Sequence, residues 1–141
     1  MNKVGCIFTV RFRYYDVREN KTKTKKRPFL IIKEENSTYP IDLTALPVSS
    51  VTNKNRLNLY YDIEINKNTY PSLNLNKEIS YIRTNKVQTI NEKDLISKVC
   101  DNFKDIYPAL YEEIEDKVKK YFDDIFSYKK RRTFILSSSF C

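Results

Sequence analysis

The sequence predicts a small, mainly β domain, a barrel of about five short strands followed by C-terminal helices. Three observations support this fold class. The chain has 141 residues, which matches the usual size of one domain, about 100–150 residues. Up to residue 90, alternating or continuous apolar segments are separated by polar turns. After residue 91, the apolar residues follow the spacing of a helix instead.

The strands are predicted from β-branched and aromatic residues in alternation. The first, over residues 4–15, is expected to turn Phe8, Val10 and Phe12 toward the core. The charged stretch 16–26 has no periodicity, and we expect it to be a loop. Further extended segments are expected at residues 28–33, 41–51 (where Pro47 indicates an edge or a bulge), 60–65 and 80–90.

The helical part is expected to begin near Asn91, where Asn91 and Asp94 resemble a capping signal. A first helix then carries its apolar side on Leu95, Ile96, Val99, Phe103 and Ile106. A second helix starts at Pro108, with an apolar side formed by Leu110, Ile114, Val118, Tyr121, Phe122 and Ile125.

We divide the chain into one domain, residues 1–126, with the barrel at 3–90 and the helices at 91–126. Residues 127–141 form a basic tail that is either disordered or adds a short strand at 134–136.

Charge favours a polyanionic partner. The chain has 26 Lys and Arg against 18 Asp and Glu, a formal net charge of +8. Residues 1–91 hold 16 basic and 8 acidic groups, whereas residues 92–124 hold 6 basic and 10 acidic groups. A nucleic acid or an acidic protein segment would therefore meet the first part of the chain.

Several function classes are excluded by composition. The chain has no histidine, which excludes Ser-His-Asp and Cys-His catalysis, histidine-ligated zinc and a two-histidine ribonuclease mechanism. A single glycine, Gly5, leaves no glycine-rich loop for phosphates of a nucleotide cofactor. Three scattered cysteines form neither a disulfide framework nor a metal motif. We expect no metal and no cofactor.

The predicted location is the cytoplasm. Scattered cysteines fit a reducing compartment, and the sequence has neither an 18-residue apolar run nor a secretory leader. We therefore expect a soluble protein without a membrane partner.

Three segments carry candidate chemistry. The first is Lys25-Lys26-Arg27-Pro28, in which Pro28 restricts Arg27 to an extended conformation before an apolar strand. A guanidinium at such a position can hold a phosphate through two hydrogen bonds. The alternative is an ordinary solvated loop rich in lysine.

The second segment is residues 46–50, Leu-Pro-Val-Ser-Ser, whose Ser49 and Ser50 hydroxyls could donate to a phosphate. The third is residues 80–90, where alternation places Arg83 and Asn85 on one side, suited to a phosphate and a base edge. Either segment could instead be a polar strand end or a solvated strand face.

Aromatic residues add candidates for base stacking. Most of the 11 Tyr and 8 Phe are expected in the core. Tyr14 and Tyr15, next to Arg13 and the basic stretch, are better placed to contact an unstacked base.

Taken in order, these segments resemble the MazF/PemK toxins. The similarity covers Val4-Gly5 at the start of a strand, the basic stretch, Arg27-Pro28, the Pro-Val-Ser-Ser segment and a strand with Arg83 that ends on Gln88-Thr89-Ile90. It spans residues 3–100. It implies an SH3-like barrel that forms a homodimer, cleaves single-stranded RNA at specific sequences without metal, arrests growth as an mRNA interferase and is neutralised by an antitoxin.

The resemblance also assigns roles. It implies that Arg27 is catalytic and that Ser49, with Ser50 as a substitute, is the hydroxyl of the site. RNA-binding roles fall on Lys25, Lys26, Arg83, Asn85, Arg13 and Tyr15. Asn85 stands where some relatives have an aspartate, and the histidine that others carry in the first loop is absent, so the proton acceptor has no assignment. The products would be 2′,3′-cyclic phosphate and 5′-hydroxyl ends.

Three other readings stay open. A toxin of the same fold could inhibit DNA gyrase, as the CcdB branch does, and would not need Arg27. The chain could also be a noncatalytic nucleic-acid-binding module, or a family member that has lost its activity.

Overall fold

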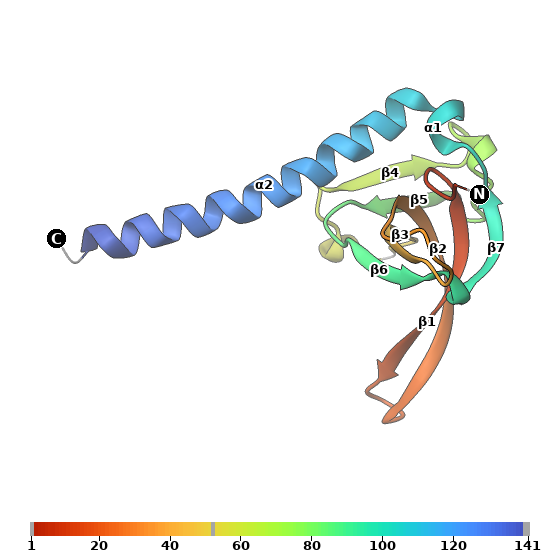
Figure 1. The fold of residues 1–141 in the computed structure, drawn as a ribbon, viewed down its shortest axis with the longest axis horizontal. Coiled ribbons are helices and arrows are strands. Elements are labelled where there is room, and N and C mark those ends of the chain that lie inside the picture. Colours follow the sequence, from red (N-terminus) through yellow and green to blue (C-terminus); the bar gives the residue numbers. More distant parts are fainter. Residues whose placement is uncertain (1, 52, 140–141) are drawn as a thin grey trace.

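The structure, a computed structural model, describes residues 2–51 and 53–139, with only the backbone for residues 128–139. A curled antiparallel sheet is followed by a long C-terminal helix (Figure 1). The prediction of a mainly β fold, a small SH3-like barrel with a helical extension, is confirmed.

The sheet has the strand order β4-β5-β3-β2-β1-β7, and β6 pairs with β3. The bounds are β1 Ile7–Asp16, β2 Lys21–Glu34, β3 Asp42–Ser49, β4 Asp62–Asn66, β5 Ile79–Arg83, β6 Gln88–Asn91 and β7 Leu95–Cys100. Single turns of 3-10 helix, η1 Lys54–Arg56, η2 Pro71–Leu73 and η3 Glu92–Asp94, lie between strands. All pairings are antiparallel.

Two apolar clusters hold the sheet. The larger one joins Leu30, Val48 and Ile82 of the sheet to Phe103, Leu110 and Ile114 of the C-terminal helices. The smaller one is centred on Val10, Phe29 and Ile31. The apolar runs of β2 and β3 are continuous because both faces of these central strands are covered.

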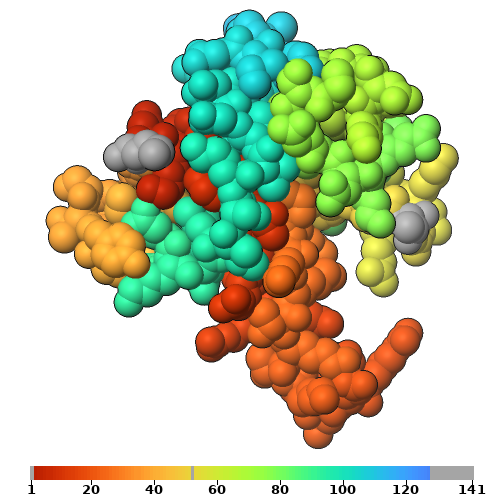
Figure 2. Space-filling view, turned by 90° about the vertical axis from the view of Figure 1, so that its right-hand side faces the viewer, coloured from red at the N-terminus to blue at the C-terminus, as the bar shows by residue number. Residues whose placement is uncertain are grey.

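The expected loop at residues 16–26 is wrong. β1 and β2 continue as a two-stranded hairpin, paired from Ile7↔Leu30 to Asp16↔Lys21, and it projects from the body (Figures 1 and 2). Outside the core both faces of these strands are exposed, so no apolar alternation marks them. Thr22 and Thr24 supply the β-branched residues, and Asn20 turns the chain with a positive φ of 53°.

The first predicted helix is also wrong. Residues 95–100 form β7, which pairs with β1 at the edge of the sheet. Asn91 is a true cap, because its side chain accepts a bond from the Lys93 N–H, but it caps only η3. The backbone hydrogen bonds that this segment forms with β1 stabilise a strand more than the helical spacing of its apolar residues favours a helix. Only α1, Phe103–Ile106, remains helical before Pro108.

The second helix, α2, begins at Pro108 as predicted and continues to Ser139. Its first turns pack on the sheet through Leu110, Tyr111 and Ile114. Further along, Tyr121 and Asp124 still contact Tyr61, and the end of the helix extends away from the body (Figure 1). A short strand at 134–136 is therefore wrong, because that backbone is helical. The end of the predicted tail, residues 140–141, lies outside the described residues.

Candidate nucleic-acid-binding site

Arg27 lies where the β1–β2 hairpin leaves the body of the sheet. It pairs with Val10 on β1, and its guanidinium carbon lies 5.0 Å from the centre of the Phe12 ring. The neighbouring Lys25 ammonium lies 5.9 Å from the same ring and 5.4 Å from the Tyr14 ring. These cation–π contacts position both cations on one face of the hairpin.

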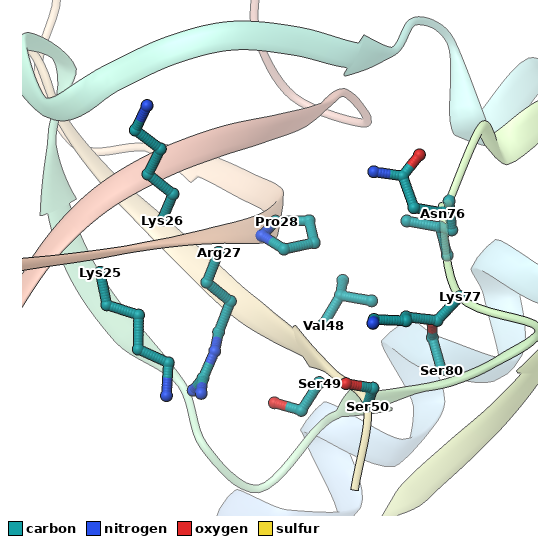
Figure 3. Close-up of a pocket in the computed structure, with 11 residues that line it drawn as sticks. Lys25, Lys26, Arg27, Pro28, Val48, Ser49, Ser50, Asn76, Lys77 and Ser80 are labelled. Atoms are coloured by element: carbon teal, nitrogen blue, oxygen red, sulfur yellow. The ribbon is translucent and has the colours of Figure 1, made fainter.

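Ser49 ends β3 beside Arg27. The β2–β3 register pairs Phe29 with Pro47, so continuing the ladder by two residues brings Arg27 opposite Ser49. Val48 is buried in the larger core cluster, and alternation therefore turns Ser49 to the outer face. Figure 3 shows the Ser49 hydroxyl turned toward the guanidinium end of the Arg27 side chain.

A pocket of about 390 Å³ opens at this point, and we call it the Arg27 pocket. Its lining includes four cations, Lys25, Lys26, Arg27 and Lys77, with no carboxylate. Ser49, Ser50 and the buried Ser80 add hydroxyl groups, and the remaining lining residues are Pro28, Val48, Leu75 and Asn76. The pocket is built to take an anion that also accepts hydrogen bonds.

The electrostatics of Arg27 favour such an anion. Partial burial lowers the pKa of the Arg27 guanidinium, and the nearby charge of Arg83 lowers it further. Burial and a like charge both disfavour the protonated form, so a bound phosphate would relieve the two costs at once.

Five of the predicted site residues come together in this pocket, namely Lys25, Lys26, Arg27, Ser49 and Ser50. They are not equivalent. Lys25 and Arg27 extend side by side in one direction, whereas Lys26 points the opposite way (Figure 3). Ser49 is half-buried and Ser50 is exposed.

Four predicted residues do not line the Arg27 pocket. Arg83 forms an ion pair with Asp62, and Asn85 lies in the turn after β5, where its Oδ1 is shielded and has no hydrogen-bond partner among the described residues. Arg13 lines a separate pocket with Arg11 and Asp42. Tyr15 is exposed and donates to Asn20 near the tip of the hairpin.

The pocket also contains residues that sequence reasoning missed. Asn76, Lys77 and Ser80 lie in or near the start of β5 and come to the pocket because β5 pairs with β3 at Ser49↔Tyr81. The ammonium of Lys77 and the amide of Asn76 point into the pocket (Figure 3). No local motif surrounds Lys77, so nothing in the sequence signals its place in the pocket, which depends on the pairing of β5 with β3.

Other kinds of site are absent from the described residues. These residues contain no group of three or more Cys, Asp or Glu side chains placed to hold a metal ion. Within the same residues, no helix combines the length and apolar character needed to cross a bilayer.

A curled antiparallel sheet with a cation-lined pocket at the base of a basic hairpin defines a small barrel protein whose pocket is suited to an anion. The family model of the PemK-like, MazF-like toxins of type II toxin–antitoxin systems matches residues 3–122. The chain therefore belongs to this toxin family. No curated protein matches the chain.

Proposed function

We propose that this toxin is an endoribonuclease that cleaves single-stranded RNA without metal and leaves 2′,3′-cyclic phosphate and 5′-hydroxyl ends. The observation that carries the proposal is the Arg27 pocket, whose lining has the cations Lys25, Arg27 and Lys77 and three serines but no carboxylate. Lys26 also lines the pocket, but its ammonium points the opposite way from Lys25 and Arg27 (Figure 3). Membership of the PemK-like, MazF-like family supports it, since toxins of this family are typically endoribonucleases.

In the proposed reaction, the ribose 2′-oxygen bonds to phosphorus while the bond from phosphorus to the 5′-oxygen breaks. The 2′-hydroxyl loses its proton to water, and the departing 5′-oxygen gains one from water. Negative charge develops on the nonbridging phosphate oxygens during this step. The partly dehydrated guanidinium of Arg27 would stabilise that charge, as electrostatic catalysis requires.

Ser49 would donate a hydrogen bond to the same phosphate, because its hydroxyl points toward the Arg27 side chain (Figure 3). Ser50, next along the chain and exposed, would be a weaker substitute. A guanidinium is a poor proton donor. Together with the lack of a carboxylate in the pocket lining, this favours charge stabilisation over acid–base catalysis as the main contribution of the site.

RNA outside the pocket would meet Lys25 and Lys77 first, because both ammonium groups lie on the pocket wall. RNA segments beyond the cleaved phosphate would contact the four predicted residues outside the pocket, namely Arg83, Asn85, Arg13 and Tyr15. We further propose, from the family alone, a homodimer and a cognate antitoxin that neutralises the toxin.

The test is to sequence the 5′-ends that the purified protein produces from single-stranded RNA in EDTA. We expect 5′-hydroxyl ends from the wild type and a loss of rate of at least about 10²-fold for Arg27→Ala, since removing one group that stabilises a developing oxyanion costs about 10²–10³. Arg18→Ala, in the turn of the hairpin, is the matched control and should keep the wild-type rate.

Full activity of Arg27→Ala would refute the site. Growth arrest by a wild type that cuts no RNA would refute the reaction and favour a toxin that binds a protein such as gyrase.

A further inference from the structure

A second hollow adjoins the Arg27 pocket, and its charge is different. It has a volume of about 430 Å³ and is lined by Lys54, Glu64, Glu78 and Tyr81 together with Ser50 and Lys77. We call it the Glu64 pocket. Ser50 and Lys77 also line the Arg27 pocket, so the two hollows are direct neighbours that share these two residues.

The two pockets differ in what they can bind. The Arg27 pocket has four cations and no carboxylate, which suits a phosphate. The Glu64 pocket has two lysines and two glutamates, so its formal charges cancel and a second phosphate would meet two carboxylates. A neutral group with hydrogen-bond donors fits this pocket better.

A row of paired residues connects the candidate serine to the carboxylate. Ser49 on β3 is opposite Tyr81 on β5, and Tyr81 is opposite Glu64 on β4. Directly opposed residues have Cβ atoms about 5 Å apart and side chains on the same face of the sheet. Glu64 is therefore two strand spacings, roughly 10 Å, from Ser49 across the outer face.

Tyr81 orients the carboxylate and offers a ring. Its hydroxyl lies 3.3 Å from Oε1 of Glu64 and donates to it. Burial and the charge of Glu64 raise the pKa of the Tyr81 phenol, so the phenol remains a donor. The ring is half-buried in the pocket wall, where an aromatic ring can stack on a base regardless of its sequence.

We propose that the Glu64 pocket is a base-recognition subsite that binds guanine next to the phosphodiester held at Arg27. The inference rests on the proposed ribonuclease function and adds a residue that determines its specificity. Glu64 would accept hydrogen bonds from guanine, and Tyr81 would stack on the base. Lys54 would neutralise the phosphate on the side of the guanine nucleotide away from Arg27.

Guanine is favoured by the arrangement of donors on its Watson–Crick edge. Guanine presents N1–H and the N2 amino group side by side, which matches the two oxygens of one carboxylate. Adenine and cytosine present one amino group beside an acceptor nitrogen, and uracil presents one N–H between two carbonyls. Each of these would place a lone pair against a carboxylate oxygen, and an unpaired polar contact in a subsite is what generates discrimination.

The carboxylates are available for this role. Neither Glu64 nor Glu78 forms a salt bridge within the part of the chain whose side chains are described. Both are exposed, so conversion to glutamine should leave the fold intact.

The first test sequences the ends cut from a randomised RNA pool by wild type, Glu64→Gln and the control Glu112→Gln, an exposed glutamate on α2. The wild type and the control should enrich guanine at one position flanking the cut. Glu64→Gln should lose that enrichment while other positions keep theirs. Replacing this guanine by inosine, which lacks the N2 amino group, should slow wild-type cleavage about tenfold, as expected for a lost bidentate contact.

A second test does not depend on cleavage. Binding of guanosine monophosphate and uridine monophosphate, followed by NMR, should favour guanosine about tenfold in the wild type and not in Glu64→Gln. Equal affinity for the two nucleotides, or enrichment of guanine that survives Glu64→Gln, would overturn the subsite. Cleavage without guanine preference overturns only the subsite, whereas guanosine binding without cleavage overturns only the ribonuclease function.

Discussion

The guanidinium of Arg83 is held by the buried carboxylate of Asp62 through two bonds, Nε to Oδ1 at 3.1 Å and Nη2 to Oδ2 at 3.2 Å. Nη2 also donates to the backbone carbonyl of Arg56 at 3.0 Å. The Asp62 side chain is only 1% exposed. Arg83 therefore stabilises the fold of β4 and β5. Its positive charge also helps to lower the pKa of the Arg27 guanidinium.

We predict that Arg83→Gln lowers the free energy of unfolding by about 3 kcal/mol, because the buried Asp62 carboxylate would lose its cationic partner, although the Asn58 N–H would still donate to it. Urea denaturation measures this change. The control is Arg56→Ala, which keeps the carbonyl that Arg83 uses and should cost less than about 0.5 kcal/mol. A stable Arg83→Gln protein that has lost only RNA affinity would show instead that Arg83 serves the ligand.

The two serines of the site should differ in their effects. Ser49→Ala is expected to reduce the single-turnover rate of RNA cleavage by about 10²-fold, the cost of one hydrogen bond to a developing oxyanion. Ser50→Ala should change it by less than about tenfold, because Ser50 is exposed and the Ser49 hydroxyl is the one that points toward Arg27 (Figure 3). The reverse order of the two effects would move the catalytic hydroxyl to Ser50.

Lys25 and Lys23 form a matched pair on one face of β2. Lys23 lies 3.0 Å from the carboxylate of Asp16 and also pairs with Glu19, whereas Lys25 contacts aromatic rings and lines the Arg27 pocket. Lys25→Ala should reduce the slope of log affinity for single-stranded RNA against log salt by about 0.7, the value for one phosphate contact. Lys23→Ala should leave the slope nearly unchanged. Fluorescence anisotropy across a salt series measures both, and equal slopes for the two variants would contradict this placement of RNA.

The sequence predicts those strands that bury the side chains of one face or of both faces in the core. The apolar run at 28–33 and the segment 41–51 mark β2 and β3 because their residues pack in the core. The hairpin beyond the body has no such burial, and its pairing, for example Phe12↔Lys25, follows from the turn and the backbone. β7 was missed because pairing with β1 is invisible in a local window.

The same distinction, between local patterns and distant strand pairing, separates the site residues that the sequence predicts from those that it does not. Arg27 and Ser49 could be proposed from sequence because each adjoins a recognisable strand, and one register brings them together. Lys77 could not, since it reaches the pocket only through the pairing of β5 with β3. The role of Arg83 was also hidden, because its partner Asp62 is 21 residues away in the sequence.

The ion pair between Lys3 and Glu92 should make the fold sensitive to acid. It connects the N-terminal segment to η3, and Glu92 also accepts from the Ile41 N–H. The bond from Lys3 is the largest cause that lowers the pKa of Glu92 below its ordinary value of 4.5. A carboxylate with a lowered pKa in the folded state stabilises that state above the unfolded pKa and loses this contribution as the pH falls through the folded pKa.

We therefore predict that Glu92→Gln has a lower thermal midpoint than the wild type at pH 7 and that the difference shrinks below pH 4.5. Differential scanning calorimetry between pH 3 and pH 7 measures it. Glu113→Gln, an exposed position on α2, controls for the loss of one negative charge. If the difference between Glu92→Gln and the wild type were constant across this range, the pair with Lys3 would not be what stabilises the junction, because a carboxylate contact must disappear once the carboxylate is protonated.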